Sequence, residues 1–133
     1  MRTLARLLLV ALLGLASSLL GGPAQAQITE LEKLNTASEA FGKREYDRAF
    51  YLWLELCQAG NRGSCFNLGL MYARGEGAPQ DYIEAYKWIH LGAEDGLPEA
   101  IAARARLASA MSAVDIKEAM TRAAQWKVDN GRR

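Results

Sequence analysis

Two cysteines, Cys57 and Cys65, have the most constrained chemistry in this sequence because of their spacing. Eight residues of one continuous helix rise about 12 Å, whereas the Cα atoms of a disulfide lie within roughly 7 Å of each other. The two can bond only if the chain reverses between them, and residues 59–63, with two glycines and an asparagine, predict a turn there. The spacing favours a structural disulfide, and a pair of free thiols stays open.

Neither redox catalysis nor metal binding is favoured for this cysteine pair. Redox enzymes use a Cys-x-x-Cys motif or a group that activates the thiol, and this spacing offers neither. A structural zinc site needs four ligands. The two thiols and His90, the only histidine, supply three at most. We expect no metal and no cofactor.

His90 is the other residue with chemical potential. It lies one predicted helical turn from Lys87 and from Glu94, which indicates a solvated surface residue. No serine or cysteine is paired with a base by its spacing. Gly75 and Gly77 do not follow a predicted strand, so a nucleotide-binding loop is not indicated. No catalytic residue is therefore predicted.

The first 26 residues have the three parts of a bacterial secretory signal. Arg2 and Arg6 give a positive start, residues 7–20 are an unbroken apolar or small stretch, and a small-x-small motif ends at Ala26. The apolar run is shorter than the roughly 17–25 residues of a membrane span. We expect cleavage after Ala26 and a periplasmic or secreted protein without a membrane span. An uncleaved N-terminal anchor is the alternative.

The charge balance limits the partners. The chain has 16 Lys and Arg against 15 Asp and Glu, a formal charge of +1. Loss of the two signal arginines leaves 14 against 15, a formal charge of −1. A near-neutral chain has no electrostatic reason to bind nucleic acid, so we expect a protein or peptide partner of unknown identity.

After the signal, apolar residues recur at spacings of three and four, which is the period of amphipathic helices. Gly42 is predicted to end the first helix in the left-handed conformation, Asp81 to cap the fourth and Ser112 to cap the last. A frayed tail is expected over residues 129–133. The predicted helices cover about residues 28–41, 46–57, 65–72, 82–93, 100–110 and 113–126.

When the sequence is aligned with itself at an offset of 36 residues, similar residues coincide: Tyr46 with Tyr82, Ala49 with Ala85 and Gly60 with Gly96. A period in the mid-thirties corresponds to a pair of helices with their connecting loops. Such a hairpin cannot bury its apolar face alone and must stack on a neighbour.

Residues 68–82, LGLMYARGEGAPQDY, closely resemble the Sel1-like repeat, a relative of the tetratricopeptide repeat. The resemblance is best over residues 64–100 and weaker over the half-repeat 45–60. Residues 101–128 depart from the pattern, which is typical of helices that cap a repeat array. The positions that match the repeat are Leu68, Gly69, Tyr72, Gly75, Gly77, Asp81, Ala85, Trp88, Gly92, Ala93, Gly96 and Ala100.

The resemblance implies an all-α fold over residues 27–128. We expect a short α/α solenoid of about six helices in three hairpins, stacked as a right-handed superhelix. Small residues such as Gly69 would lie where helices cross, and Trp88 would fill the space between them. The cysteine spacing is similar to that of an exported, cysteine-rich branch of the family. There, the two cysteines staple the helices of one repeat, which implies a disulfide between Cys57 and Cys65.

The same resemblance implies a function on a surface groove. The first hypothesis is an exported, non-enzymatic adaptor that binds a protein or peptide on the concave side, lined by the first helix of each hairpin. Candidate contact residues are those not needed for packing: Arg48, Tyr51 and Glu55 on one helix, and Glu84, Lys87, His90 and Leu91 on the next.

Two other functions stay open. Cysteine-rich relatives are linked to binding or hydrolysing β-lactam-like cell-wall compounds, although this sequence has no Ser-x-x-Lys nucleophile motif. The chain could instead cap other repeat proteins or dimerise with them.

Overall fold

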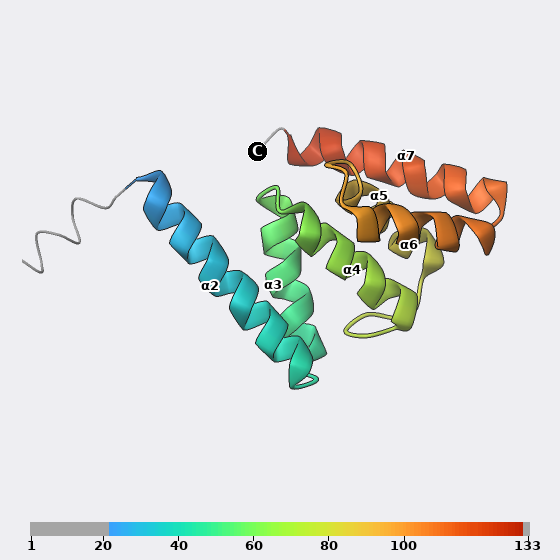
Figure 1. Cartoon of the computed structure of the whole chain (residues 1–133). Helices are drawn as coiled ribbons and strands as arrows, with labels where there is room; N and C mark the ends of the chain where they lie inside the picture. Colours follow the sequence, from blue (N-terminus) through green and yellow to red (C-terminus); the bar gives the residue numbers. More distant parts are fainter. Residues whose placement is uncertain (1–21, 132–133) are drawn as a thin grey trace, which may run out of the picture. The chain divides into compact units, whose positions relative to one another are not determined.

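The computed structural model describes residues 22–131, and this part of the chain forms six α-helices and no strands (Figure 1). The all-α prediction is confirmed. The predicted signal falls mostly on residues 1–21, which lie outside the described residues. The chain divides into two units, residues 1–32 and 33–133, and the packing below concerns the second. The helices are α2 (Pro23–Gly42), α3 (Tyr46–Gln58), α4 (Arg62–Arg74), α5 (Tyr82–Gly92), α6 (Pro98–Ser109) and α7 (Ala113–Asn130).

Three helices, α2, α4 and α6, begin earlier than the apolar pattern predicts, because polar or proline residues start them. Asn61 caps α4, and its side chain accepts a hydrogen bond of 2.9 Å from the backbone N–H of Ser64. The turn between the cysteines is therefore shorter than predicted. Pro98 starts α6 at a position where a missing N–H costs nothing.

The ends of α2 and α7 also differ from the prediction. The left-handed residue after α2 is Arg44, with φ of 62°, and not Gly42. The helix runs through Gly42, and the chain reverses two residues later, where Glu45 N–H bonds the carbonyl of Ala40 at 2.9 Å. At the other end, α7 includes Asp129 and Asn130, which were expected to fray. The Asn130 side chain donates to the carbonyl of Gln58 at 3.0 Å, which ties this end to α3.

The predicted caps of α5 and α7 are present. Asp81 Oδ1 accepts hydrogen bonds from the backbone N–H groups of Ile83 and Glu84 at 2.8 and 3.0 Å. Ser112 Oγ accepts from the N–H of Asp115 at 3.1 Å and donates to its carboxylate at 2.8 Å. These bonds satisfy donors that a helix start leaves unpaired, so the starts of both helices are fixed by local sequence.

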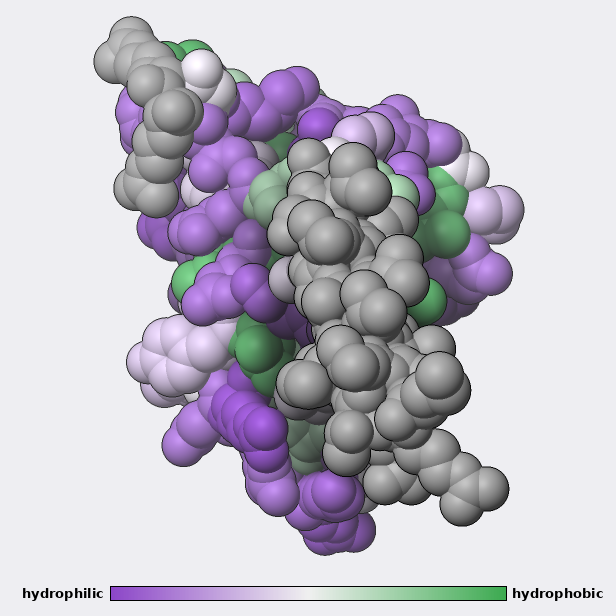
Figure 2. All heavy atoms as spheres, turned by 90° about the vertical axis from the view of Figure 1, so that its left-hand side faces the viewer, coloured by the Kyte–Doolittle hydropathy of each residue, from purple (hydrophilic) through white to green (hydrophobic). Residues whose placement is uncertain are grey.

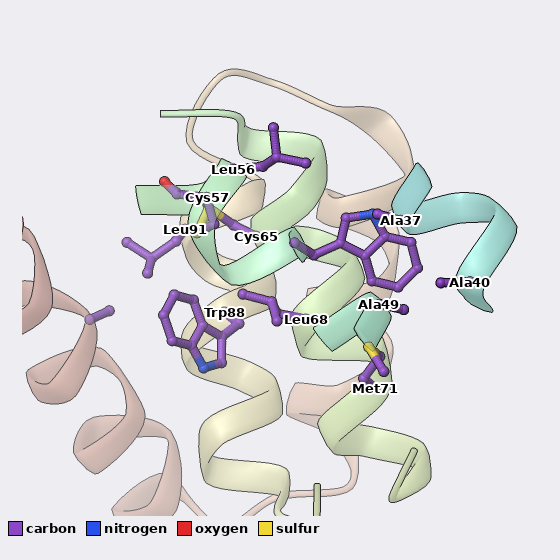
Figure 3. Close-up of a cluster of buried hydrophobic side chains, with 12 residues drawn as sticks. Ala37, Ala40, Ala49, Leu56, Cys57, Cys65, Leu68, Met71, Trp88 and Leu91 are labelled. Carbon is purple, nitrogen blue, oxygen red and sulfur yellow. Dashed lines mark hydrogen bonds between the residues drawn. A yellow bond between two sulfur atoms is a disulfide. The ribbon is translucent and has the colours of Figure 1, made fainter. Parts of the chain in front are cut away.

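The core joins the C-terminal half of α2 with α3, α4, α5 and α7. Leu68 is fully buried, and Figure 3 shows it between Trp88 and Met71, with Leu91 and the disulfide nearby. Small residues complete the cluster at its edges, among them Ala37 from α2 and Ala123 from α7. One continuous core therefore connects helices α2 to α5 with the last helix, α7.

The most extensive contact between two helices of the described chain is that of α4 with α5. A Cβ at Gly69 would meet the carbonyl oxygen of Ala85 and the backbone nitrogen of Ile89 at 2.8 Å, and would press on the Ile89 side chain. A Cβ at Gly92 would lie 2.9 Å from the backbone nitrogen of Phe66. The two glycines thus allow backbone-to-backbone contact, as the sequence predicted for Gly69.

The loop between these helices depends on two more glycines. Gly75 ends α4 in the left-handed conformation, with φ of 69°. Gly77 has φ of 72°, and a Cβ there would lie 2.8 Å from the carbonyl oxygen of Tyr46 at the start of α3. The loop therefore packs against the neighbouring hairpin helix only because these residues lack side chains.

We expect Gly69→Ala to lower the free energy of unfolding by about 1–3 kcal/mol, because overpacking must separate α4 from α5. Urea unfolding followed by circular dichroism measures this change. The matched control is Gly42→Ala, where a Cβ meets nothing within 4 Å, and its stability should stay within about 1 kcal/mol of the wild type. Equal stability of the two variants would contradict the close crossing.

Candidate partner-binding surface

Three of the predicted contact residues, Arg48, Tyr51 and Glu55, lie on one exposed face of α3. Their spacing of three and four residues places them on the side opposite Ala49 and Trp53, which are buried in the core. We call these three residues the α3 face. Tyr51 is 66% exposed, the highest exposure among the large aromatic residues of the described chain.

The charges of the α3 face are held by neighbours. Arg48 pairs with Glu45 at 3.2 Å, and Glu55 pairs with Lys33 of α2 at 2.9 Å. All four side chains are substantially exposed, so each pair adds only a few tenths of a kcal/mol to stability. The ion pairs orient the charges beside Tyr51 without removing them from solvent.

The four residues predicted on α5 do not form an open surface with the α3 face. Leu91 is 0% exposed and belongs to the core together with Ala123 of α7. The rings of Trp88 and Trp126 meet edge to face, with centroids 5.4 Å apart. The assignment of Leu91 to a groove is therefore wrong, because α7 packs along this side of α5.

Glu84 and Lys87, predicted as contact residues, belong to a partly buried network. The Glu84 carboxylate accepts hydrogen bonds from Lys87 Nζ at 3.0 Å, Trp88 Nε1 at 3.1 Å and Arg122 Nη1 of α7 at 2.9 Å. The side chains of Glu84 and Lys87 are only 18% and 13% exposed. The Lys87 ammonium also lies 4.3 Å from the centre of the Trp88 ring.

This network influences two titrating groups. Burial, followed by the charges of Glu84 and Asp81, raises the pKa of Tyr72. Hydrogen bonds to Glu118 and Glu84 raise the pKa of Arg122. Glu84 therefore links α4, α5 and α7 electrostatically, and its contacts serve the fold.

His90 is half-buried instead of solvated. Its Nδ1 lies 3.2 Å from Nη1 of Arg104 on α6, and its ring stacks on Tyr86 with centroids 6.3 Å apart. Since the guanidinium can only donate, Nδ1 accepts and the imidazole is neutral. Burial, and then the charge of Arg104, lower the pKa of His90, against an opposing effect of Glu94.

This environment predicts a pH-dependent stability. A histidine whose pKa is lower in the folded state binds protons more readily when unfolded. We expect stability to be full above pH about 6.5, the ordinary histidine value, and to fall as the pH drops below it. His90→Gln keeps an acceptor for Arg104 without a titrating ring, so the decrease between pH 7.5 and 5.5 should become smaller. Urea unfolding at both pH values measures it, and an unchanged decrease in the variant would refute the assignment.

A disulfide between Cys57 and Cys65 joins the end of α3 to the start of α4, with Cα atoms 4.9 Å apart. Both residues are fully buried in the core. Figure 3 shows the bond beside Leu91, which comes from α5. Within residues 22–131, no group of three His, Cys, Asp or Glu side chains is arranged to hold a metal ion.

We expect reduction of this disulfide to lower the free energy of unfolding by about 2–3 kcal/mol, the value that the chain-entropy account gives for so short a loop. Urea unfolding with and without a reductant measures the difference. The Cys57→Ala/Cys65→Ala double variant is the control, and its stability should not respond to the reductant. If the free energy of unfolding of the wild type is also unchanged by the reductant, the expectation is contradicted.

The coloured surface in Figure 2 is mostly polar. On the face shown in Figure 2, hydrophilic side chains make up most of the coloured surface, and hydrophobic ones form small separate groups. In the part of the chain that the structure describes, the exposed large hydrophobic residues are Ile28, Leu31, Tyr51, Tyr82, Ile101, Val114, Met120 and Val128.

A groove between α2 and α4 was not singled out by the sequence. It consists of two hollows of about 270 and 460 Å³ that share Asn67 as a lining residue. We call it the α2/α4 groove. Its walls come from segments about 30 residues apart in the chain, so no local motif could have revealed it. The wall residues are Leu34, Ser38 and Phe41 of α2, and Phe66, Asn67 and Leu70 of α4.

The fold and these surfaces define an α-helical repeat protein, with paired helices stacked on a shared core. The family model of the Sel1 repeat matches residues 39–61 and 63–97. Residues 39–97 are therefore Sel1 repeats, and the described chain forms a solenoid of helical hairpins. The matches confirm the predicted resemblance to the Sel1 repeat, whereas the likeness to the cysteine-rich branch stays a prediction. No curated protein matches the sequence significantly.

Sel1 repeats are generally protein–protein interaction modules, and proteins built from them are typically not enzymes. Among the described helices, none has both the length and the apolar character needed to cross a membrane.

Proposed function

We propose that this chain is an exported interaction module that holds a protein or peptide partner on the α3 face. The observation that carries the proposal is the exposed Tyr51, flanked by Arg48 and Glu55. Tyrosine and arginine are over-represented among residues that dominate binding energy at interfaces. The two flanking charges would set the register of the partner.

The rigidity of α3 supports this use of its outer face. Its inner face is anchored in the core by Trp53, and its last turn is bonded to α4 through the disulfide. A surface that is ordered before binding loses little conformational entropy when a partner docks. The α3 face meets this condition.

The pattern of residues 1–26 supports export, together with the disulfide. Disulfides persist in oxidising compartments such as a periplasm. Cleavage after Ala26 would shorten α2 by its first four residues, Pro23–Ala26, and leave every core residue in place. The proposed mature protein is therefore residues 27–133, periplasmic or secreted.

The alternative functions rest on different grounds. Activity on β-lactam-like cell-wall compounds is implied by the family resemblance alone, and no described side-chain cluster favours it. Capping of other repeat proteins would use the outer face of α7, where Val114 is 77% exposed. Interaction through α3 has the more specific support.

The proposal predicts that Tyr51→Ala weakens partner capture. Loss of an interface tyrosine of this kind costs about 2 kcal/mol, so we expect at least a tenfold loss of the captured protein. The measurement is affinity capture from an envelope extract with the exported protein as bait, quantified by mass spectrometry. The intact mass of the bait also tests the removal of residues 1–26.

Tyr82→Ala is the matched control, because Tyr82 is also an exposed tyrosine but lies on α5. It should capture as much partner as the wild type. If both variants lose the partner equally, or neither does, the α3 face is not the binding surface.

A further inference from the structure

The α2/α4 groove runs along α4. Along α4 it extends from Gly63 to Arg74, and eleven residues of helix correspond to about 16 Å. An extended segment advances about 3.3 Å per residue, so about five extended residues match the length.

The middle of the groove offers a polar anchor. Asn67 is half-buried and lines both hollows. Its side-chain amide makes no hydrogen bond to any group within residues 22–131. An amide both donates and accepts, so it can pair with the N–H and C=O groups of an extended backbone lying across it.

The two ends of the groove carry opposite charges. Arg74 lines one end, and its nearest acid is Glu76, at 3.9 Å. Glu99 lines the other end, is exposed, and forms no ion pair with the described residues. A peptide that complements this surface has an acidic side chain near Arg74 and a basic side chain near Glu99.

We infer that the α2/α4 groove is a second binding surface, whose ligand is an extended segment of another protein about five residues long. The segment carries an acid at one end and a base at the other, and small or apolar residues between them contact Leu34, Phe41 and Leu70. This surface is distinct from the α3 face, because Trp53, which lines the groove, projects from the opposite side of α3 to Tyr51. It therefore goes beyond the function proposed above.

A library of displayed random seven-residue peptides, selected on the immobilised oxidised protein, tests the inference. We expect enrichment of peptides with an acid and a base about four residues apart, in one fixed order along the peptide. In the Arg74→Glu/Glu99→Lys double variant, the order of acid and base should reverse. Asn67→Ala should weaken the best wild-type peptide by at least tenfold.

The matched control is Arg106→Glu, which reverses an arginine on α6 outside the groove. It should select the same peptides as the wild type. Thermal unfolding of every variant confirms that the fold is intact. No enrichment, enrichment that ignores the charge reversal, or binding abolished by Tyr51→Ala would each overturn the inference.

Discussion

At the crossing of α4 and α5, the two backbones are closer than a single methyl group would allow. Gly69 and Gly92 create this approach, and the other contacts of α5 follow from it. With α5 held against α4, Trp88 and Leu91 enter the same core as Leu68. The helix pair then presents Glu84 on the side where α7 packs. A widening at the crossing would shift both apolar and ionic contacts, because they belong to one rigid helix.

The last helix of the described chain, α7, covers one side of α5. Two ion pairs join the helices. Arg122 of α7 pairs with Glu84 of α5 at 2.9 Å, and Lys127 of α7 pairs with Glu94, just after α5, at 2.7 Å. Trp126 packs on Trp88 between these two points. The first helices of the two hairpins are α3 and α5. Since α7 packs on α5, the accessible face is the one on α3. The packing of α7 thus decides that the outer face of α3, and not that of α5, stays exposed.

The helices, their caps and the crossing glycines could be predicted from the sequence, because each depends on residues close in the chain or on the repeat pattern. Asp81 and Ser112 cap helices through bonds to residues two or three positions away. The burial of Leu91 could not be predicted, since it depends on a helix more than 20 residues later whose sequence departs from the repeat. The α2/α4 groove could not be predicted for the same reason. It is formed by α2 and α4, two helices distant in the sequence, on either side of Trp53.

The disulfide closes a loop within one hairpin and does not bridge separate hairpins. A thiol eight residues from its partner meets it often even in a disordered chain, so oxidation does not have to wait for the distant contacts of the solenoid. If the chain is exported as proposed, emerging into an oxidising compartment, the α3–α4 pair is locked while α5, α6 and α7 are still emerging. The first hairpin would then act as the template on which the later helices assemble.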